Sequence, residues 1–355
     1  VLGRLDRDRH RTQARADDAD QHGRLRGEVN PVNAGAVVDR SADLTVEFRS
    51  MASDVRFWVV APREGAAAQA RTAREVVEAV ARTCTRFDPD SDLMRANAAG
   101  KRRTVVAREC FDALRAAYDA YVATDGLFDP RVLRTLTAYG YDMSLPFADR
   151  SIDLPTAEAA PRRRTRRRWK PSFDEASLEV AVGPEPVDLG GIGKGLAMSW
   201  ASSQLRDAGQ AVLVEAGGDL MALGGGPDGT GWMVGVESPS GTGDPAAVLR
   251  LVDRACATSS IRLRSWTAGG TQVHHLVDPR TGRSAESDLV SVTVVGSDPA
   301  TCEVWSKSLF VVGRAGIRAA ADDRGLAALW IDARGYVGVS RAMRPYVGWQ
   351  VSRVA

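Results

Sequence analysis

Regular hydrophobic patterning begins near position 51 and continues to the end of the chain. Residues 55–59 alternate between apolar and polar side chains, which predicts a half-buried strand. Apolar residues at helical spacing over 76–87 predict a helix, and the sequence Asp-Pro-Asp-Ser at 88–91 is a turn signal that ends it. A second helix is expected over 114–121, closed by an Asp-Gly pair.

Beyond position 187 the chain becomes rich in glycine, and short apolar stretches recur that are typical of strands. These stretches lie at 211–214, 232–236, 248–252, 273–277, 290–295, 326–331 and 336–339. Helices are expected over 196–208 and 300–312. Because strands and helices mix without strict alternation, we expect an α+β fold and not a doubly wound parallel sheet.

The N-terminal region has a different composition. Residues 4–26 contain almost no large apolar side chain, so they cannot bury a core and are expected to be disordered. We therefore divide the chain into an N-terminal extension, 1–48, and a folded domain, 49–355. Because Met51 opens the patterned segment, we hypothesise that residues 1–50 lie upstream of the biological start. No apolar stretch of the signal-peptide type precedes the domain, which favours a cytoplasmic location.

Composition narrows the classes of partner. The 355 residues include 47 Lys and Arg against 45 Asp and Glu, a net charge of +2, which gives no reason to expect a nucleic-acid partner. The arginine-rich run at 162–168 is interpreted as a solvated surface loop, because no aromatic platform accompanies it. No run approaches the roughly 18 apolar residues that a membrane helix needs. The four cysteines form no CxxC pair and are interpreted as isolated buried thiols.

The strongest chemical signal is the glycine-rich segment 188–195, which leads into a predicted helix. Glycines let the backbone approach a ligand closely, the helix start attracts anions, and Lys194 adds a positive charge. The segment therefore suits a phosphate or diphosphate, although a purely structural turn is the alternative. It is neither a P-loop nor a dinucleotide-binding fingerprint, since Asp188 and Gly195 stand where a P-loop requires Gly and Ser or Thr.

Three further segments could carry chemistry. The paired glycines of 215–220 form either a tight turn or a close approach to a flat ligand. The adjacent His274 and His275 point to opposite faces of a strand, so one of them can serve a site as a proton acceptor, with Asp278 fixing the turn that follows. Glu303 and Lys307 are four residues apart and lie on one helix face. They form either a surface ion pair or an acid and a cation beside the phosphate loop.

Together, and in this order, these segments resemble the ApbE family of FAD:protein FMN transferases. The resemblance runs from about Met51 to the C-terminus. The matching motifs lie at 51–53 (as the entry strand), 86–91, 126–130, 188–195, 216–219, 257–259 and 275–279. The resemblance implies an α+β fold of mixed, T-fold-like sheets with packed helices. It also implies that the FMN half of FAD is transferred to a Thr hydroxyl of an acceptor protein, with release of AMP.

The resemblance also assigns roles to residues. His275 stands at the position of the catalytic histidine. FAD lies between the glycine loop and the strands that follow it, against Met51, Phe128, Asp129, Asp188, Lys194, Gly218, Asp219, Thr258 and Leu276. In this family Mg²⁺ sits at the diphosphate, which places Gly191, Glu303 and Lys307 at the metal position. Hydrolysis of FAD to FMN and AMP, and flavin storage without turnover, remain alternatives to transfer.

Two residues depart from the family's pattern at the metal position. Glu303 replaces an Asp, and Lys307 replaces a Thr that ligates the metal. A protonated Lys has no lone pair and cannot coordinate Mg²⁺. Lys307 therefore either substitutes for part of the metal's charge or pairs with Glu303, and we expect a weakened or altered dependence on metal.

Overall fold

The computed structural model describes residues 43–142, 153–154, 168–239, 243–262 and 264–354. The predictions for residues 1–42 and for most of the arginine-rich run, 162–167, lie outside these ranges.

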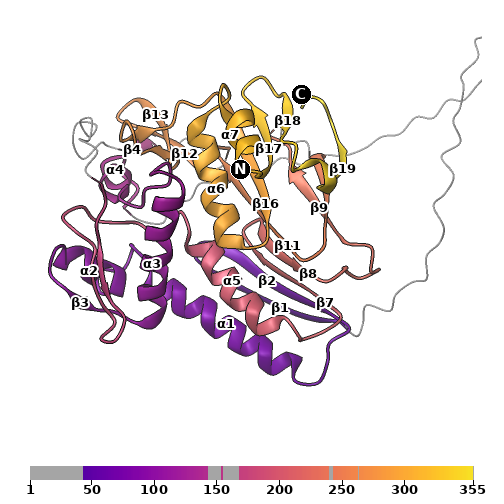
Figure 1. Cartoon of the computed structure of the whole chain (residues 1–355), viewed down its shortest axis with the longest axis horizontal. Coiled ribbons are helices and arrows are strands. Elements are labelled where there is room, and N and C mark those ends of the chain that lie inside the picture. Colours follow the sequence, from indigo (N-terminus) through magenta and orange to yellow (C-terminus); the bar gives the residue numbers. More distant parts are fainter. Residues whose placement is uncertain (1–42, 143–152, 155–167, 240–242, 263, 355) are drawn as a thin grey trace, which may run out of the picture. The chain divides into compact units, whose positions relative to one another are not determined.

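An antiparallel sheet of eight strands forms the centre of the fold (Figure 1). Its spatial order is β1-β2-β7-β8-β11-β16-β17-β18, and each neighbouring pair is antiparallel. The strands are β1 (Leu44–Ser50), β2 (Ser53–Val60), β7 (Ala211–Ala216), β8 (Asp219–Leu223), β11 (Arg254–Ser260), β16 (Leu289–Gly296), β17 (Ala327–Asp332) and β18 (Val337–Val339). The expected α+β class is confirmed.

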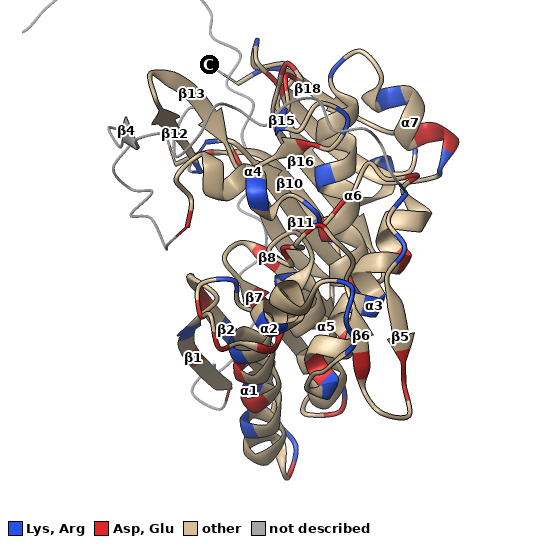
Figure 2. Ribbon diagram, turned by 90° about the vertical axis from the view of Figure 1, so that its left-hand side faces the viewer, with Lys and Arg blue, Asp and Glu red and all other residues tan. Residues whose placement is uncertain are grey.

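Helices cover one face of this sheet (Figures 1 and 2). They are α1 (Ala66–Thr83), α5 (Gly193–Leu205), α6 (Pro299–Val312) and α7 (Ile317–Asp323). Alternate residues of the strands, such as Phe57 and Val214, point to this face and pack in one apolar core with Val77, Met198 and Phe310. Burial of the apolar faces of these helices holds α5 and α6 side by side over the middle of the sheet.

The intervening residues of the same strands point to the opposite face. There Leu213 and Leu329 pack against Trp232, Leu249 and Leu251 in a second core. The covering layer is a small antiparallel sheet and a 3₁₀ turn: β9 (Trp232–Glu237), β10 (Pro245–Leu251), β19 (Val347–Gln350) and η2 (Arg344–Tyr346).

Smaller elements pack at one end of the helical layer. The first group is α2 (Asp92–Ala99), β3 (Thr104–Val105), α3 (Arg108–Ala123), β5 (Ser172–Asp174) and β6 (Glu179–Ala181). Its core, around Phe111 and Trp169, includes Leu196 and Ala300, so it abuts the N-terminal turns of α5 and α6. The second group is α4 (Leu133–Ala138), β4 (Asp153–Leu154), β12 (Ser265–Ala268), β13 (Thr271–His274), β14 (Val277–Asp278) and β15 (Arg283–Ser284).

The folded domain begins earlier than the sequence pattern suggests. Strand β1, which the sequence places in the N-terminal extension, pairs with β2 along its whole length. The segment Met51-Ala52, expected to open the entry strand, is instead the two-residue turn between β1 and β2, and both residues have positive φ values of 50° and 55°. The turn brings Met51 beside the cavity described below.

Three other expectations need correction. Helix α1 ends at Thr83, before Phe87, and the strand expected over 273–277 is divided between β13 and β14. All four cysteines are free, and Cys110, Cys256 and Cys302 are buried as expected. Cys84 is only partly buried and is not isolated, because a hydrogen bond from Cys110 lowers the pKa of its thiol.

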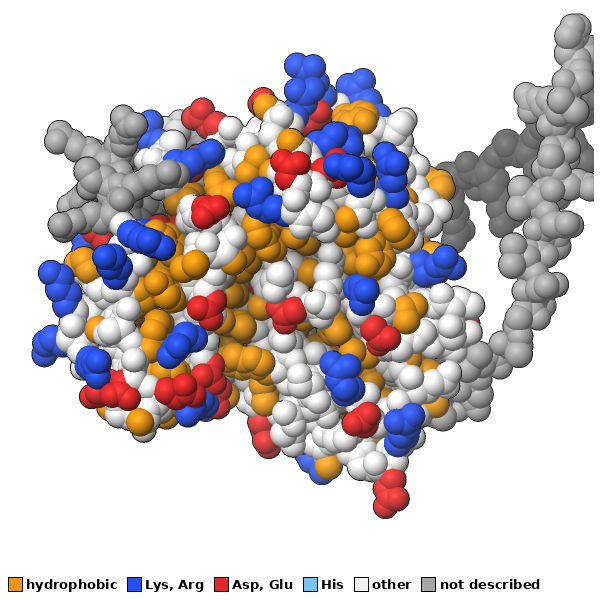
Figure 3. Space-filling view, in the orientation of Figure 1, with side chains coloured by type: hydrophobic (Ala, Val, Ile, Leu, Met, Phe, Trp, Pro, Cys, Tyr) orange, Lys and Arg blue, Asp and Glu red, His pale blue; other side chains and the backbone are white. Residues whose placement is uncertain are grey.

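The described helices and the visible surface agree with the composition. None of these helices is both long enough and apolar enough to cross a membrane. On the face shown in Figure 3, basic and acidic side chains are interspersed.

The contact between α5 and α6 depends on Gly195. A Cβ on Gly195 would lie 2.5 Å from Ala300 Cα and 2.8 Å from Pro299 O, both backbone atoms that cannot move independently. We expect Gly195→Ala to lower the free energy of unfolding by about 3 kcal/mol or more, at the upper end of the cost of overpacking. Chemical denaturation measures this change.

Gly193 in the same helical turn is the matched control. A Cβ there meets no atom within 4 Å, so Gly193→Ala should change stability by no more than about 1 kcal/mol. Equal effects of the two substitutions would contradict the packing argument.

Candidate functional site

A cavity of about 460 Å³ opens where the helical layer meets the smaller elements. Its walls come from the β1–β2 turn, the end of α1, the loop after α3, the glycine loop before α5, the segment between β13 and β14, and α6. The sequence-predicted residues that line it are Met51, Phe128, Asp129, Asp188, Gly191, Lys194, His275, Leu276 and Lys307. Segments that are far apart in sequence thus form one site.

The glycine loop is held by its own hydrogen bonds. Asp188 is buried and accepts a hydrogen bond from Gly190 N at 3.0 Å, while Gly193 N donates to Leu189 O at 2.7 Å. A Cβ on Gly191 would lie 2.9 Å from Phe128 Cε2 and 3.5 Å from Lys307 Cδ. Glycine is needed at 191 because both side chains pack directly against the loop.

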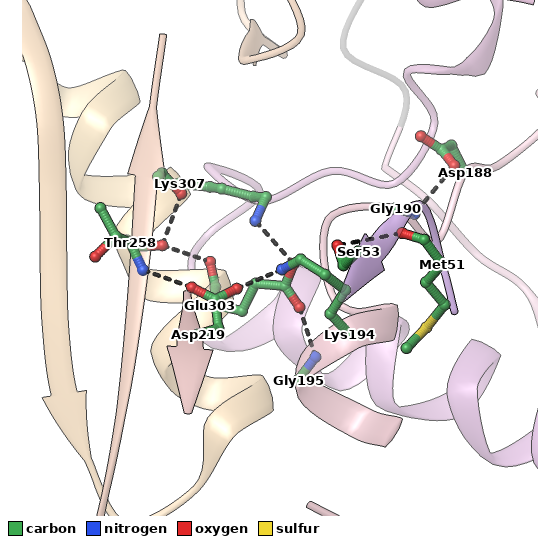
Figure 4. Close-up of polar contacts among 12 residues, drawn as sticks. Met51, Ser53, Asp188, Gly190, Lys194, Gly195, Asp219, Thr258, Glu303 and Lys307 are labelled. Atoms are coloured by element: carbon green, nitrogen blue, oxygen red, sulfur yellow. Dashed lines mark hydrogen bonds and ion pairs between the residues drawn. The ribbon is translucent and has the colours of Figure 1, made fainter. Parts of the chain in front are cut away.

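Lys194 and Lys307 converge on Glu303 (Figure 4). Each Nζ lies 3.1 Å from Glu303 Oε1, although the two lysines come from different helices, α5 and α6. Glu303 Oε2 accepts a hydrogen bond from Gly195 N at 2.8 Å, so the carboxylate also satisfies the N-terminal turn of α5. The sequence predicted the contact between Glu303 and Lys307, but not that Lys194 shares the same oxygen.

Asp219 and Thr258 form a layer behind Lys194. Asp219 accepts a hydrogen bond from Lys194 through Oδ2, and from Thr258 N at 2.8 Å through Oδ1. The Thr258 hydroxyl lies 2.9 Å from that of Thr293. Gly218 lies in the turn between β7 and β8 with a φ of 90°. Gly218, Asp219 and Thr258 lie behind Lys194 and are not among the residues that line the cavity.

The ionisation of the cluster follows from its contacts. Burial disfavours the charged form of Glu303, but Lys194 and Lys307 lower the pKa of its carboxyl to about 2. Burial also disfavours the charged form of Lys194, yet Asp219 and Glu303 raise its pKa above 10.5. Burial lowers the pKa of Lys307, and Glu303 offsets part of that effect. The cluster thus places the amino groups of Lys194 and Lys307 against the carboxyl groups of Glu303 and Asp219.

The adjacent histidines point to different surroundings, as their spacing predicts. His274 Nε2 lies 3.1 Å from Ala285 O, and its ring packs edge-on against Phe310. His275 lines the cavity, with its Nδ1 3.2 Å from Arg264 O. Since a carbonyl only accepts hydrogen bonds, Nδ1 carries the proton and Nε2 is the free base in the neutral ring.

The charge of His275 is set by its surroundings. Burial lowers its pKa well below 6.5, and the positive charges of Arg264 and Lys307 lower it further. The imidazole is therefore neutral near pH 7. The turn after it is fixed by Asp278, whose backbone carbonyl accepts a hydrogen bond from Gly282 N at 2.8 Å, as the sequence predicts.

Asp129, Arg86 and Arg264 also line the cavity; Arg86 lies in the matching motif at 86–91, but neither arginine was assigned a role from the sequence. Asp129 forms an ion pair with Arg131, in which Arg131 Nη2 lies 2.7 Å from Asp129 Oδ2. Arg86 lies 3.8 Å from Asp188, and its guanidinium is stacked over Phe87 and Tyr141, at 4.3 and 4.1 Å from the ring centroids.

Arg264 also lines the cavity and lies close enough to affect the pKa of both Lys194 and His275. Among the described residues, it forms no ion pair. No sequence motif marked Arg264 as a site residue.

The residues at the implied metal position do not fit a divalent cation. Gly191 and Glu303 do come together, but both lie against the Lys307 side chain, Gly191 beside its Cδ and Cε atoms and Glu303 at its ammonium group. The oxygens of Glu303 already accept hydrogen bonds from Lys194, Lys307 and Gly195. In the part of the chain that the structure describes, no three His, Cys, Asp or Glu residues are grouped to hold a metal ion.

Relatives of known name share parts of this sequence. A relative named FAD:protein FMN transferase in Haemophilus influenzae is 32% identical over 143 residues, which cover 39% of this chain and 41% of the relative. The chain thus matches less than half of that relative's length. A second FAD:protein FMN transferase, from Salmonella typhimurium, is 28% identical over 256 residues, or 69% of this chain and 71% of the relative.

Solved structures share the fold. The crystal structure of the ApbE protein from Thermotoga maritima superimposes with a TM-score of 0.73 at 24% identity, covering 86% of this chain and 99% of that one. The flavin transferase ApbE from Vibrio cholerae gives a TM-score of 0.68 at 19% identity, over 86% of this chain and 99% of that one. The model of the ApbE family matches residues 45–330, most of the folded domain, and the chain therefore belongs to the ApbE family.

Proposed function

We propose that this protein transfers the FMN half of FAD to a Thr hydroxyl of an acceptor protein. The observation that carries the proposal is that one cavity places the neutral His275 beside Lys194, Lys307 and Arg264, an arrangement of one base and three cations. Relatives named FAD:protein FMN transferase support the same activity.

The reaction is a phosphoryl transfer. The acceptor hydroxyl oxygen attacks the phosphorus on the FMN side of the FAD diphosphate and forms a new P–O bond. The bond from that phosphorus to the bridging oxygen breaks, and AMP leaves with the electron pair. The hydroxyl proton passes to a base, so the products are the flavinylated acceptor, AMP and one proton.

His275 is the proposed base. Its Nδ1–H is held by Arg264 O at 3.2 Å, which leaves Nε2 to accept the hydroxyl proton. The backbone N–H of His275 donates to the same carbonyl at 3.4 Å, which fixes the residue against the loop. This hydrogen bond holds the ring in the tautomer whose Nε2 can accept a proton.

The cations stabilise the phosphoryl group. Negative charge that develops on its oxygens lies in a partly closed cavity, where fixed positive groups act more strongly than in water. Lys194 and Arg264, which both line the cavity, supply such groups. The apolar part of the wall includes Leu127, Phe128 and Leu276 and suits the flat flavin ring. The cavity volume of about 460 Å³ is in the range of small-molecule sites.

One assay separates transfer from the other flavin chemistries. The protein is incubated with FAD and a peptide that carries a candidate acceptor Thr, and both flavin fluorescence on the peptide and free AMP are measured. Transfer requires labelled peptide and AMP in equal amounts. AMP and free FMN without labelled peptide would mean hydrolysis, and tight FAD binding without AMP would mean storage, and either result refutes the proposal.

The location of the protein is a separate matter. A cytoplasmic location stays a prediction, with which four free cysteines are compatible.

Substitution of His275 tests the base. His275→Ala and His275→Asn should each reduce the rate of transfer by about 10²–10⁴-fold, the usual contribution of a general base. FAD affinity should change little. The Asn variant keeps a hydrogen-bond donor for Arg264 O, so its inactivity would show loss of the base and not of the anchor.

The neighbouring His274 provides the control. His274→Gln alters a buried ring that contacts Ala285 O and Phe310, outside the cavity. Its rate of transfer should remain within about fivefold of the wild type, well short of the loss of a general base. Wild-type rates in the His275 variants would exclude this residue as the base.

The pH dependence follows from the lowered pKa of His275. Protonation removes the base, so kcat/KM should fall only as the pH drops through a pKa well below 6.5. Because the charge of Arg264 helps to lower that pKa, Arg264→Gln should move the acid limb to higher pH. Profiles of kcat/KM against pH for both proteins check this, and an acid limb that does not move in the variant would contradict it.

A further inference from the structure

We propose that the ammonium group of Lys307 takes the place of the divalent cation implied by the ApbE resemblance, so that this protein transfers FMN without a metal ion. The inference rests on the proposed function. It also makes a statement about metal binding that can be measured apart from activity.

The position of Lys307 is the first support. Its side chain leaves α6, passes the glycine loop with Cδ 3.5 Å from the place of a Gly191 Cβ, and ends 3.1 Å from Glu303 Oε1. Figure 4 shows its amino group directed toward Glu303 and Lys194. A positive charge already stands between the loop and the acid that the resemblance assigns to the metal.

The carboxylates nearby are the second support. Glu303 gives one oxygen to the two lysines and the other to Gly195 N at 2.8 Å. Asp219 gives one oxygen to Lys194 and the other to Thr258 N at 2.8 Å. A divalent ion would have to displace these donors and would lie close to two ammonium groups, whose charges repel it.

Hydrogen-bonding capacity is the third support. An ammonium group has three donors. Lys307 uses one on Glu303, and Lys194 uses two, on Glu303 and Asp219. The remaining N–H groups can reach phosphate oxygens while both ion pairs stay in place. The lysines therefore hold a diphosphate without first releasing the carboxylates.

Overall charge is the fourth support. Two lysines balance two carboxylates, and Arg264 adds a cation that, among the described residues, has no ion-pair partner. The backbone offers less, because Gly190, Gly193 and Gly195 already donate within the protein. Side-chain cations are therefore the main partners available to the diphosphate, whose charges need partners in a dry site.

The test compares metal binding and transfer in the wild type and Lys307→Thr. Each protein is freed of metal, loaded with FAD and titrated with Mn²⁺, and bound Mn²⁺ is measured by electron paramagnetic resonance. Transfer to the acceptor peptide is measured in excess EDTA and in millimolar Mg²⁺. Lys101→Thr, which removes an exposed lysine, is the matched control and should behave as the wild type.

The wild type should bind no Mn²⁺ at the FAD site, and its transfer rate should differ by less than about twofold between EDTA and Mg²⁺. Lys307→Thr removes the built-in cation, so in EDTA it should lose about 10²-fold or more of the rate, the scale of losing one preorganised charge. Mg²⁺ should restore it, with Mn²⁺ bound. Lys307→Met has neither the charge nor a ligand, so its loss should not be restored.

The inference is overturned if the wild type with FAD binds one Mn²⁺ and loses most of its transfer rate in EDTA. It is also overturned if Lys307→Thr or Lys307→Met transfers FMN in EDTA as fast as the wild type. Circular dichroism and FAD affinity establish that the variants are folded. If no protein transfers FMN under any condition, the proposed function fails, while the Mn²⁺ titrations still decide between a lysine and a metal at this position.

Discussion

The arrangement of the site depends on the carboxylate of Glu303. It lies at the centre of a buried ionic cluster, with Lys194 and Lys307 on one oxygen and the amide of Gly195 on the other. Because Gly195 and Lys194 belong to α5, while Glu303 and Lys307 belong to α6, this one side chain links the two helices. Loss of this carboxylate would leave two buried ammonium groups without their shared partner, which is far more costly than loss of a surface ion pair.

The fold makes that contact possible by bringing the two helices unusually close. Gly195 packs against the backbone of Ala300, where any side chain would collide, and this approach puts Glu303 within reach of the first turn of α5. Under the helices, β8 and β11 lie side by side in the sheet and supply Asp219 and Thr258 as a second layer. The site is thus built where helix N-terminus and strand ends meet, a place that favours anions before any side chain is added.

Much of this arrangement could be predicted from the sequence. Each part that could not has its own physical reason. The period of apolar residues indicated β2, α3, α5 and α6, because burial on one face imposes that period. The contact between Glu303 and Lys307 follows from helical spacing. The contact between Lys194 and Glu303 spans 109 residues, and no local pattern encodes it. Strand β1 was missed although its apolar residues Leu44, Val46 and Phe48 alternate with polar ones, because it was grouped with the polar segment that precedes it. Met51-Ala52 was missed as a turn because neither residue is the Gly or Asn that such turns favour.

The ionic cluster itself is difficult to explain by stability alone. Removing four charged groups from water is costly, and apolar residues of similar volume often give an equally stable or more stable core at such a position. Apolar side chains, Phe128, Leu276 and Val311, line the cavity beside Lys194 and Lys307. An excess of positive charge from Arg264 makes the cluster less favourable still in the absence of an anion. The charges fit the proposed substrate, because a diphosphate would give Arg264 and the remaining N–H groups of the two lysines their partners and so offset the cost of burying these cations.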